Sequence, residues 1–163
     1  MNVPLTDAPT NPRFESLLAA FASRMGLPAP REGLGLQLQA DPLTVRVLAD
    51  AALEDRLLVE VDIAPAQDAP AQALALLHRI NHVARLRHGW QVSLAEDDHI
   101  VMHTQRSLTK TDTAALESLL EAALERATDL HALWQKTLAA LEAQNSLAAH
   151  QSLQSLGPSA LRG

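Results

Sequence analysis

Residues 70–87 constrain the fold most, because they form one long amphipathic segment between two groups of strand-like segments. Pro70 suits the first turn of a helix, where no backbone N–H is needed, and Gly89 suits its end. One broad apolar face has helical spacing and predicts a helix that covers a sheet. Its members are Ala73, Leu74, Leu76, Leu77, Ile80, Val83 and Ala84.

A second, narrower strip of the same segment carries small and amphipathic side chains. They are Ala71, Ala75, His78, His82 and Leu86. Small side chains of this kind leave room for another backbone. We therefore expect this helix to cover the sheet with one face and to meet a second copy of the chain with the other.

The composition excludes several classes of function. A formal net charge of −6 over 163 residues argues against a surface for nucleic-acid phosphates, and the absence of Tyr argues against a base-stacking platform. The absence of cysteine excludes disulfides, thiol chemistry and cysteine zinc sites, and fits a reducing compartment. No apolar stretch reaches the roughly 20 residues that span a bilayer, and the first residues show no signal-peptide pattern.

The rest of the chain alternates helical and strand-like patterns. A first helix is predicted from Asn11, a capping residue followed by proline, to Gly26. Short segments of alternating apolar and polar residues predict five strands. They span residues 34–39, 43–49, 57–63, 90–94 and 99–103. Turns at 41–42 and 96–98 join neighbouring strands, which favours antiparallel pairing.

A final long helix is predicted to open in a capping pattern at residues 109–112 and to fade near Asn145. Residues 1–10 and 145–163 lack apolar periodicity, so we expect flexible tails there. The resulting order, α-β-β-β-α-β-β-α, predicts an α+β domain over residues 11–144. In this domain three helices pack on an antiparallel sheet.

The search for catalytic motifs is negative, because the chain holds no P-loop, no nucleophile elbow and no H-E-x-x-H pair. His78 and His82 form an i, i+4 pair that can chelate a metal. No third ligand lies at a helical interval, so we interpret the pair as part of a helix edge or interface. We expect no catalytic residue, metal site or cofactor. A small metal-dependent enzyme using this pair is the less favoured alternative, which metal analysis would test.

Apolar residues on both faces of the predicted sheet indicate a second covered surface. Leu48 and Leu58 fall on the face opposite Val45, Val47 and Val59. A helical layer can bury only one face of each strand. The other face is therefore a candidate surface for a partner chain or a ligand.

Three segments in this order resemble the class I type III secretion chaperones, also called the CesT or Tir-chaperone family. They are PRFESLLAAFASRMGLP at 12–28, ALALLHRIN at 73–81 and LTKTDTAALESLLEAALERATDLHALWQKTL at 108–138. The F-x-x-L-L-x-x-F-A-x-x-x-G-L-P pattern within the first is the sharpest signal. The resemblance covers roughly residues 12 to 141.

The resemblance implies a homodimeric, ATP-independent export chaperone of the bacterial cytoplasm. Such a protein binds the N-terminal region of a secreted effector, keeps it non-globular and helps to target it to the secretion apparatus, whose ATPase is a further implied partner. The implied effector-binding residues are Phe14, Leu17, Leu18, Phe21, Met25, Leu34, Leu36, Leu38, Leu48 and Leu58. The implied dimer interface holds Ala71, Ala75, His78, His82, Leu86, Trp90, Val92 and Leu94.

A regulator with the same fold, which sequesters another regulatory protein, is the nearer alternative. The partner recovered in a pull-down would separate it from an effector chaperone. Neither nucleic acid nor a membrane is expected as a partner.

Overall fold

The computed structural model describes residues 11–30, 35–50, 53, 55–67 and 69–155, with the backbone alone described for 82–88 and 149–155. Predictions for the tail at 1–10 and for Leu34 lie outside these residues. The elements in order are α1 (Pro12–Met25), β1 (Leu36–Ala40), β2 (Leu43–Ala49), β3 (Arg56–Pro65), α2 (Ala71–His88), β4 (Gln91–Leu94), β5 (His99–Ser107), the 3-10 turn η1 (Leu108–Lys110) and α3 (Thr113–Ser155). This sequence of helices and strands confirms the predicted order.

The five strands form one antiparallel sheet in the order β1-β2-β3-β5-β4. The connection through α2 carries the chain past β3 to the far edge, so that β5 returns beside β3 and β4 lies outside it. Gly35 precedes β1 with φ +68, and a Cβ there would collide with the carbonyl oxygen of Val47. Glycine is therefore required where the chain enters the edge strand.

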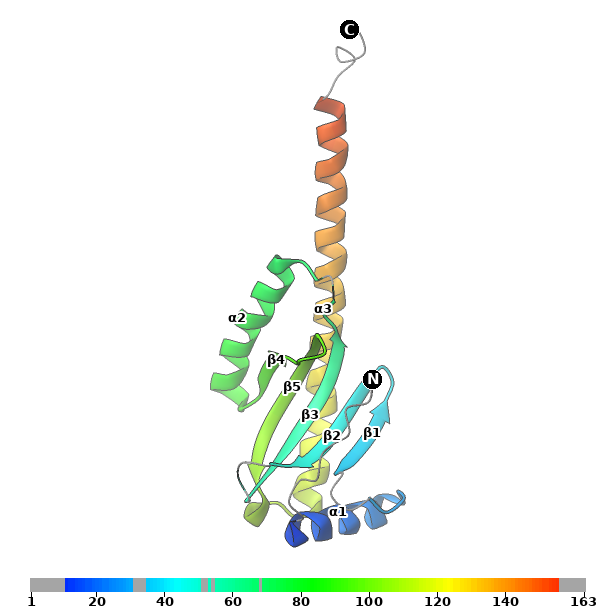
Figure 1. The fold of residues 1–163 in the computed structure, drawn as a ribbon, viewed down its shortest axis with the longest axis vertical. Coiled ribbons are helices and arrows are strands. Elements are labelled where there is room, and N and C mark those ends of the chain that lie inside the picture. The colour runs from blue at the N-terminus through cyan, green and yellow to red at the C-terminus, as the bar shows by residue number, and fades with distance from the viewer. Residues whose placement is uncertain (1–10, 31–34, 51–52, 54, 68, 156–163) are drawn as a thin grey trace.

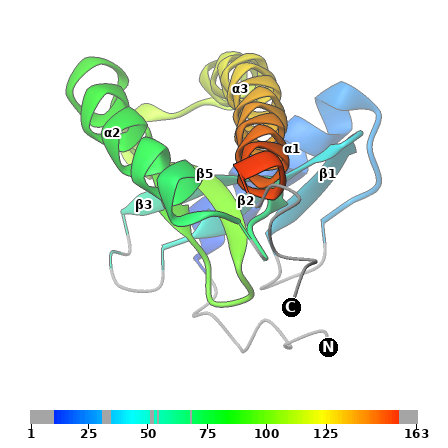
Figure 2. The same ribbon diagram turned by 90° about the horizontal axis from the view of Figure 1, so that it is seen from above.

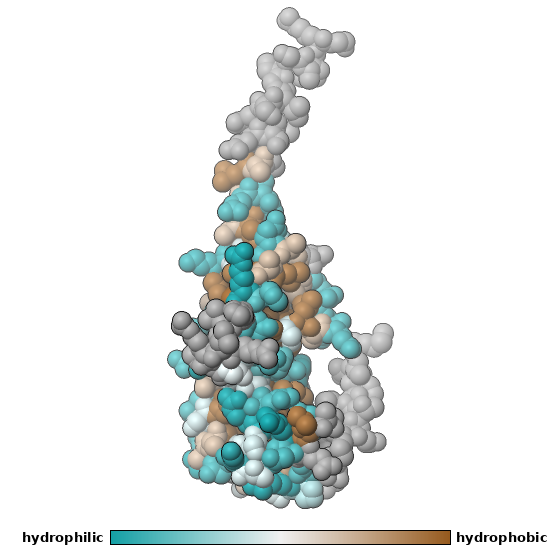
Figure 3. Space-filling model, turned by 90° about the vertical axis from the view of Figure 1, so that its left-hand side faces the viewer, coloured by the Kyte–Doolittle hydropathy of each residue, from teal (hydrophilic) through white to brown (hydrophobic). Residues whose placement is uncertain are grey.

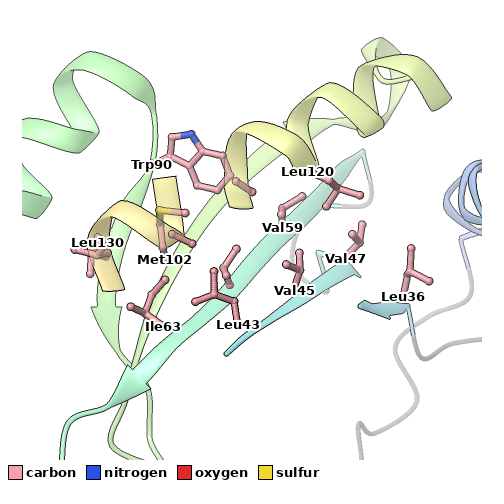
Figure 4. Close-up of a cluster of buried hydrophobic side chains, with 14 of the residues drawn as sticks. Leu36, Leu43, Val45, Val47, Val59, Ile63, Trp90, Met102, Leu120 and Leu130 are labelled. Carbon is pink, nitrogen blue, oxygen red and sulfur yellow. The ribbon is translucent and has the colours of Figure 1, made fainter. Parts of the chain in front are cut away.

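The long helix α3 crosses one face of the sheet over β2 and β3 (Figure 1). Seen from above, α2 and α3 lie on the same side of the sheet, with α2 beside β4 and α1 against α3 (Figure 2). Aliphatic side chains from β2 and β3 point toward Leu120 and Leu130 of α3 (Figure 4). Each fully buried side chain of this size contributes roughly 1.5–3 kcal/mol.

The ends of α1 follow the predicted signals. The Asn11 side-chain oxygen accepts hydrogen bonds from the backbone N–H groups of Arg13 and Phe14, at 3.1 and 3.2 Å. Gly26 ends the helix with φ +66, and the Leu27 N–H donates to the Ala22 carbonyl at 2.8 Å. Both ends therefore supply partners for groups that a helix leaves unpaired.

The final helix starts later and ends later than expected. Residues 108–110 form η1, and Asp112 caps α3 by accepting from the N–H of Ala115 at 2.8 Å. The helix then continues past Asn145 to Ser155, above the sheet in Figure 1. Residues 145–155 contain no glycine or proline and several good helix formers, so nothing in the sequence stops the helix there.

Candidate partner-binding surface

The two faces of the sheet differ in cover and in chemistry. On the face that meets α3, Val45, Val47 and Val59 are at most 1% exposed. Neither α2 nor α3 lies over the opposite face, which we call the open face (Figure 2). Leu48 and Leu58 pair across β2 and β3 on that open face and are both partly buried. The prediction that these leucines lie opposite the valines is confirmed.

Charged side chains cross the open face beside these leucines. The Arg46 guanidinium bonds Glu60 at 2.5 Å and lies 3.7 Å from Asp62. His99 Nδ1 lies 2.8 Å from the Asp62 carboxylate, and this hydrogen bond raises the pKa of His99. Burial lowers the pKa of His103, which pairs with Glu60 across β3 and β5. The open face therefore carries a network of charged side chains around a small apolar patch.

Five of the ten residues expected to bind the effector are buried in the single chain. The large apolar side chains of α1 other than Met25 are buried in the core, and Leu36 lies in the core opposite Val47. The buried members are Phe14, Leu17, Leu18, Phe21 and Leu36. As placed in this single chain, they hold α1 on the domain and offer no surface to a partner. A helical period shows which residues share a face but not what covers that face.

The accessible members of the same set lie in three places. Met25, 46% exposed, stands at the C-terminal end of α1. Leu38 is partly buried on the edge strand β1, and Leu48 and Leu58 form the patch on the open face.

The residues expected at a dimer interface also differ in their exposure. On α2, Ala71, Ala75 and His78 are exposed, whereas the side chains of His82 and Leu86 lie outside the described residues. Trp90 and Val92 are buried in the core of their own chain, since they face the helix layer. Leu94, at the end of β4, is 49% exposed.

The apolar face of α2 is only partly covered. Ala73 is fully buried, and Leu77 and Ile80 pack against the core from its margin. Leu74 remains 36% exposed. Figure 3 shows the side of the molecule where α2 lies, with hydrophobic residues exposed among hydrophilic ones. The prediction that this helix covers the sheet therefore holds for a narrower strip than expected.

Polar contacts hold α2 at the sheet edge where apolar contacts are sparse. The Asn81 side-chain oxygen accepts from the N–H of Val92 at 2.9 Å, which joins α2 to β4. Thr104, only 2% exposed, donates to the carbonyl of Gly89 at 2.9 Å and accepts from Arg106 at 2.7 Å. These bonds fix the C-terminal end of α2 while leaving its outer face open.

A pocket of about 390 Å³ lies between the β1–β2 turn and the middle of α3. We call it the turn–helix pocket. It is lined by Ala40, Asp41, Pro42, Leu43, Leu124, Thr128 and His131. Sequence reasoning missed it, because its two walls come from distant parts of the chain. The i, i+4, i+7 spacing of Leu124, Thr128 and His131 was the one signal for the helical wall.

Among the described residues, no group of three His, Asp or Glu side chains could hold a metal ion. His78 is exposed on α2, and the side chain of His82 is outside the described part. No helix in the described ranges has the length and apolar character needed to cross a membrane.

Comparison with protein families gives one match over most of this fold. The model of the Tir chaperone protein (CesT) family matches residues 16–131, from α1 through the middle of α3. A comparison with curated protein sequences finds no match.

Three solved structures share the fold. The ExsC-ExsE complex has a TM-score of 0.67 at 23% identity, covering 76% of this chain and 95% of the matched chain. The HopA1-SchA chaperone-effector complex has a TM-score of 0.62 at 18% identity, covering 74% and 94%. The Yersinia pestis type III secretion chaperone SycH, in complex with a stable fragment of YscM2, has a TM-score of 0.55 at 24% identity, covering 72% and 98%. At these identities the likeness establishes the fold.

Proposed function

The chain belongs to the Tir chaperone protein (CesT) family, and we propose on this basis that it is a type III secretion chaperone that binds the N-terminal region of a secreted effector. It keeps this region non-globular until export, in the bacterial cytoplasm, and passes it to the secretion apparatus and its ATPase. The observation that carries the proposal is the family match over residues 16–131. Secretion chaperones are not enzymes, and binding of this kind needs no catalytic residue.

The open surfaces of the chain suit a non-globular ligand. Strands β1 and β4 are the two edges of the sheet, so each has a row of backbone groups without a partner strand. An extended segment can add hydrogen bonds at such an edge and insert alternate side chains into nearby pockets. Met25, Leu38, Leu48 and Leu58 are the apolar residues that we assign to this contact.

We assign the outer face of α2 to a homodimer. Leu74, Ala75 and His78 are exposed there, and Leu94 is a further exposed apolar residue, on the edge strand β4. The short side chains of Ala71 and Ala75 allow a second helix to approach closely. Monomers rarely expose large apolar helix faces without a partner.

Co-expression with the product of the neighbouring gene tests effector binding. The wild type is expected to keep the N-terminal region of that product soluble in a complex that survives size exclusion. Leu58→Glu is expected to release it, because a charge would enter the apolar patch of the open face. Ala114→Glu is the matched control, since Ala114 is exposed in the first turn of α3, where an acidic residue is favourable.

A wild type that solubilises no candidate effector would contradict the chaperone function. Capture of the effector by a folded Leu58→Glu chain would contradict only the assigned patch. Mass spectrometry of the captured protein separates an effector from a regulatory protein.

A further inference from the structure

We propose that the turn–helix pocket binds a lysine or arginine side chain of the partner's extended segment. This inference rests on the proposed function, because it assigns one subsite for the segment that the chaperone holds. The pocket combines an apolar floor with polar groups that can only accept hydrogen bonds from a ligand.

Hydrogen bonds within the chain decide which polar atoms of the pocket can donate to a ligand and which can accept from it. His131 Nδ1 lies 2.8 Å from the carbonyl oxygen of Ile63. A carbonyl only accepts, so Nδ1 carries the proton and donates it. When the ring carries a single proton, that proton is on Nδ1 and the other ring nitrogen, Nε2, is an acceptor.

The Thr128 hydroxyl can also only accept a hydrogen bond from a ligand. It donates to the carbonyl of Leu124 at 2.8 Å, one turn earlier on α3, so only its lone pairs remain for a ligand. Asp41 adds a carboxylate at the turn, and its side chain makes no ion pair with the described residues. All three polar groups therefore favour a ligand rich in N–H donors, and Asp41 favours one with positive charge.

The apolar lining suits the stem of a long basic side chain. Pro42 and Leu43 at the turn and Leu124 on α3 line the pocket together with Ala40. Lysine and arginine bury their methylene groups along apolar surface and keep the charged end among polar groups. A partner's aspartate or glutamate is disfavoured, because it would meet acceptors and a like charge without a donor.

The position of the pocket connects it to the peptide-binding edge. Ala40 is the last residue of β1, the edge strand, and lines the pocket itself. A segment that pairs with β1 therefore passes the pocket at the end of the strand. The net charge of −6 further favours the approach of a basic segment.

The test uses the full chain with capped amino acids as probes. Nα-acetyl-lysine amide and Nα-acetyl-arginine amide are titrated at low ionic strength, while the methyl signals of Leu43, Leu124 and Thr128 are followed by NMR. We expect saturable shifts at these methyl groups. Nα-acetyl-norleucine amide has the lysine stem without the ammonium group and is expected to bind at least tenfold more weakly.

Two variants test the assigned acceptors. Asp41→Asn is expected to weaken lysine amide binding at least fivefold, and Thr128→Val by a smaller factor. Asp97→Asn is the matched control, because it removes the same charge from an exposed turn between β4 and β5. Equal binding of norleucine amide, absence of saturable shifts, or an equal loss with Asp97→Asn would each overturn the proposal.

The same variants separate this inference from the proposed function. If Asp41→Asn captures the secreted partner as tightly as the wild type does, the pocket is not a subsite, although the chaperone function stands. If the wild type captures no partner while the amides bind as expected, the chaperone function fails and the preference of the pocket for cations stands.

Discussion

Leu57 and Leu58 are neighbours on β3, yet they belong to different surfaces of the molecule. Leu57 is fully buried under the helix layer, whereas Leu58 lies partly buried on the open face beside Leu48. The two leucines share residue type, strand and backbone conformation. Their comparison indicates that one face of the sheet holds the fold together while the other remains available to a partner.

The largest effect is expected from the buried member of this pair. Leu57→Ala should reduce the free energy of unfolding by about 2–5 kcal/mol, because it leaves a cavity in a closed core. Leu58→Ala should cost less than half as much, since its side chain already meets solvent. Urea unfolding of both variants measures the difference, and equal losses would contradict the division between the two faces.

Like the open face of the sheet, the outer face of α2 is a surface that we assign to a partner, here a second copy of the chain. Ala75→Glu should weaken the dimer more than tenfold, which corresponds to about 1.4 kcal/mol or more, because a charge would be desolvated at the interface. Ala114→Glu adds the same charge at an exposed position of α3, outside α2, and serves as the control. Light scattering at micromolar concentration measures the mass. A wild type that scatters as a monomer would contradict the assigned interface.

The network of charged side chains on the open face should contribute less to stability than the core does. Arg46→Ala removes the partner of Glu60 and Asp62, and the expected loss is about 1 kcal/mol, because these side chains remain partly exposed. The loss should shrink in high salt. A loss as large as that of Leu57→Ala would mean that ion pairs, and not burial alone, hold the strands together.

The smallest effect is expected from the two histidines of the open face. The pKa of His99 is raised by its hydrogen bond to Asp62, so its stabilisation is full below about pH 6.5 and is lost as pH rises through the folded pKa. The pKa of His103 is lowered by burial, so its contribution is present above about pH 6.5 and is lost as pH falls through its folded pKa.

NMR titration of the His99 and His103 imidazole rings checks the directions of the two pKa shifts. His99 should titrate at a higher pH than His103, and Asp62→Asn should bring the pKa of His99 down. A lower pKa for His99 than for His103 in the wild type would contradict the arrangement.

Local sequence signals predicted the elements well because their causes are local. The caps at Asn11 and Gly26 satisfy groups within one turn, and strand alternation placed Leu57 and Leu58 on opposite faces. Whether Phe21 is available to an effector depends on contacts that are distant in the sequence. Periodicity placed it on the apolar face of α1, but only the packing of α1 against α3 shows that this face is closed.

The turn–helix pocket was unpredictable for a related reason. Asp41 and Thr128 line the same pocket only because the β1–β2 turn lies beside the middle of α3 in the fold. No spacing within either segment reveals such a meeting. Likewise, the extent of α3 beyond Asn145 follows from helix propensity without apolar periodicity, which a search for amphipathic faces does not detect.

The length of α3 affects how the molecule moves through a solvent. Its 43 residues span about 64 Å at 1.5 Å per residue, which exceeds the diameter of a compact domain of this size. Such a rod increases friction without adding mass. A single chain should therefore elute from a sizing column ahead of a spherical standard of 17.6 kDa, and elution volume alone would overstate the number of chains in the particle.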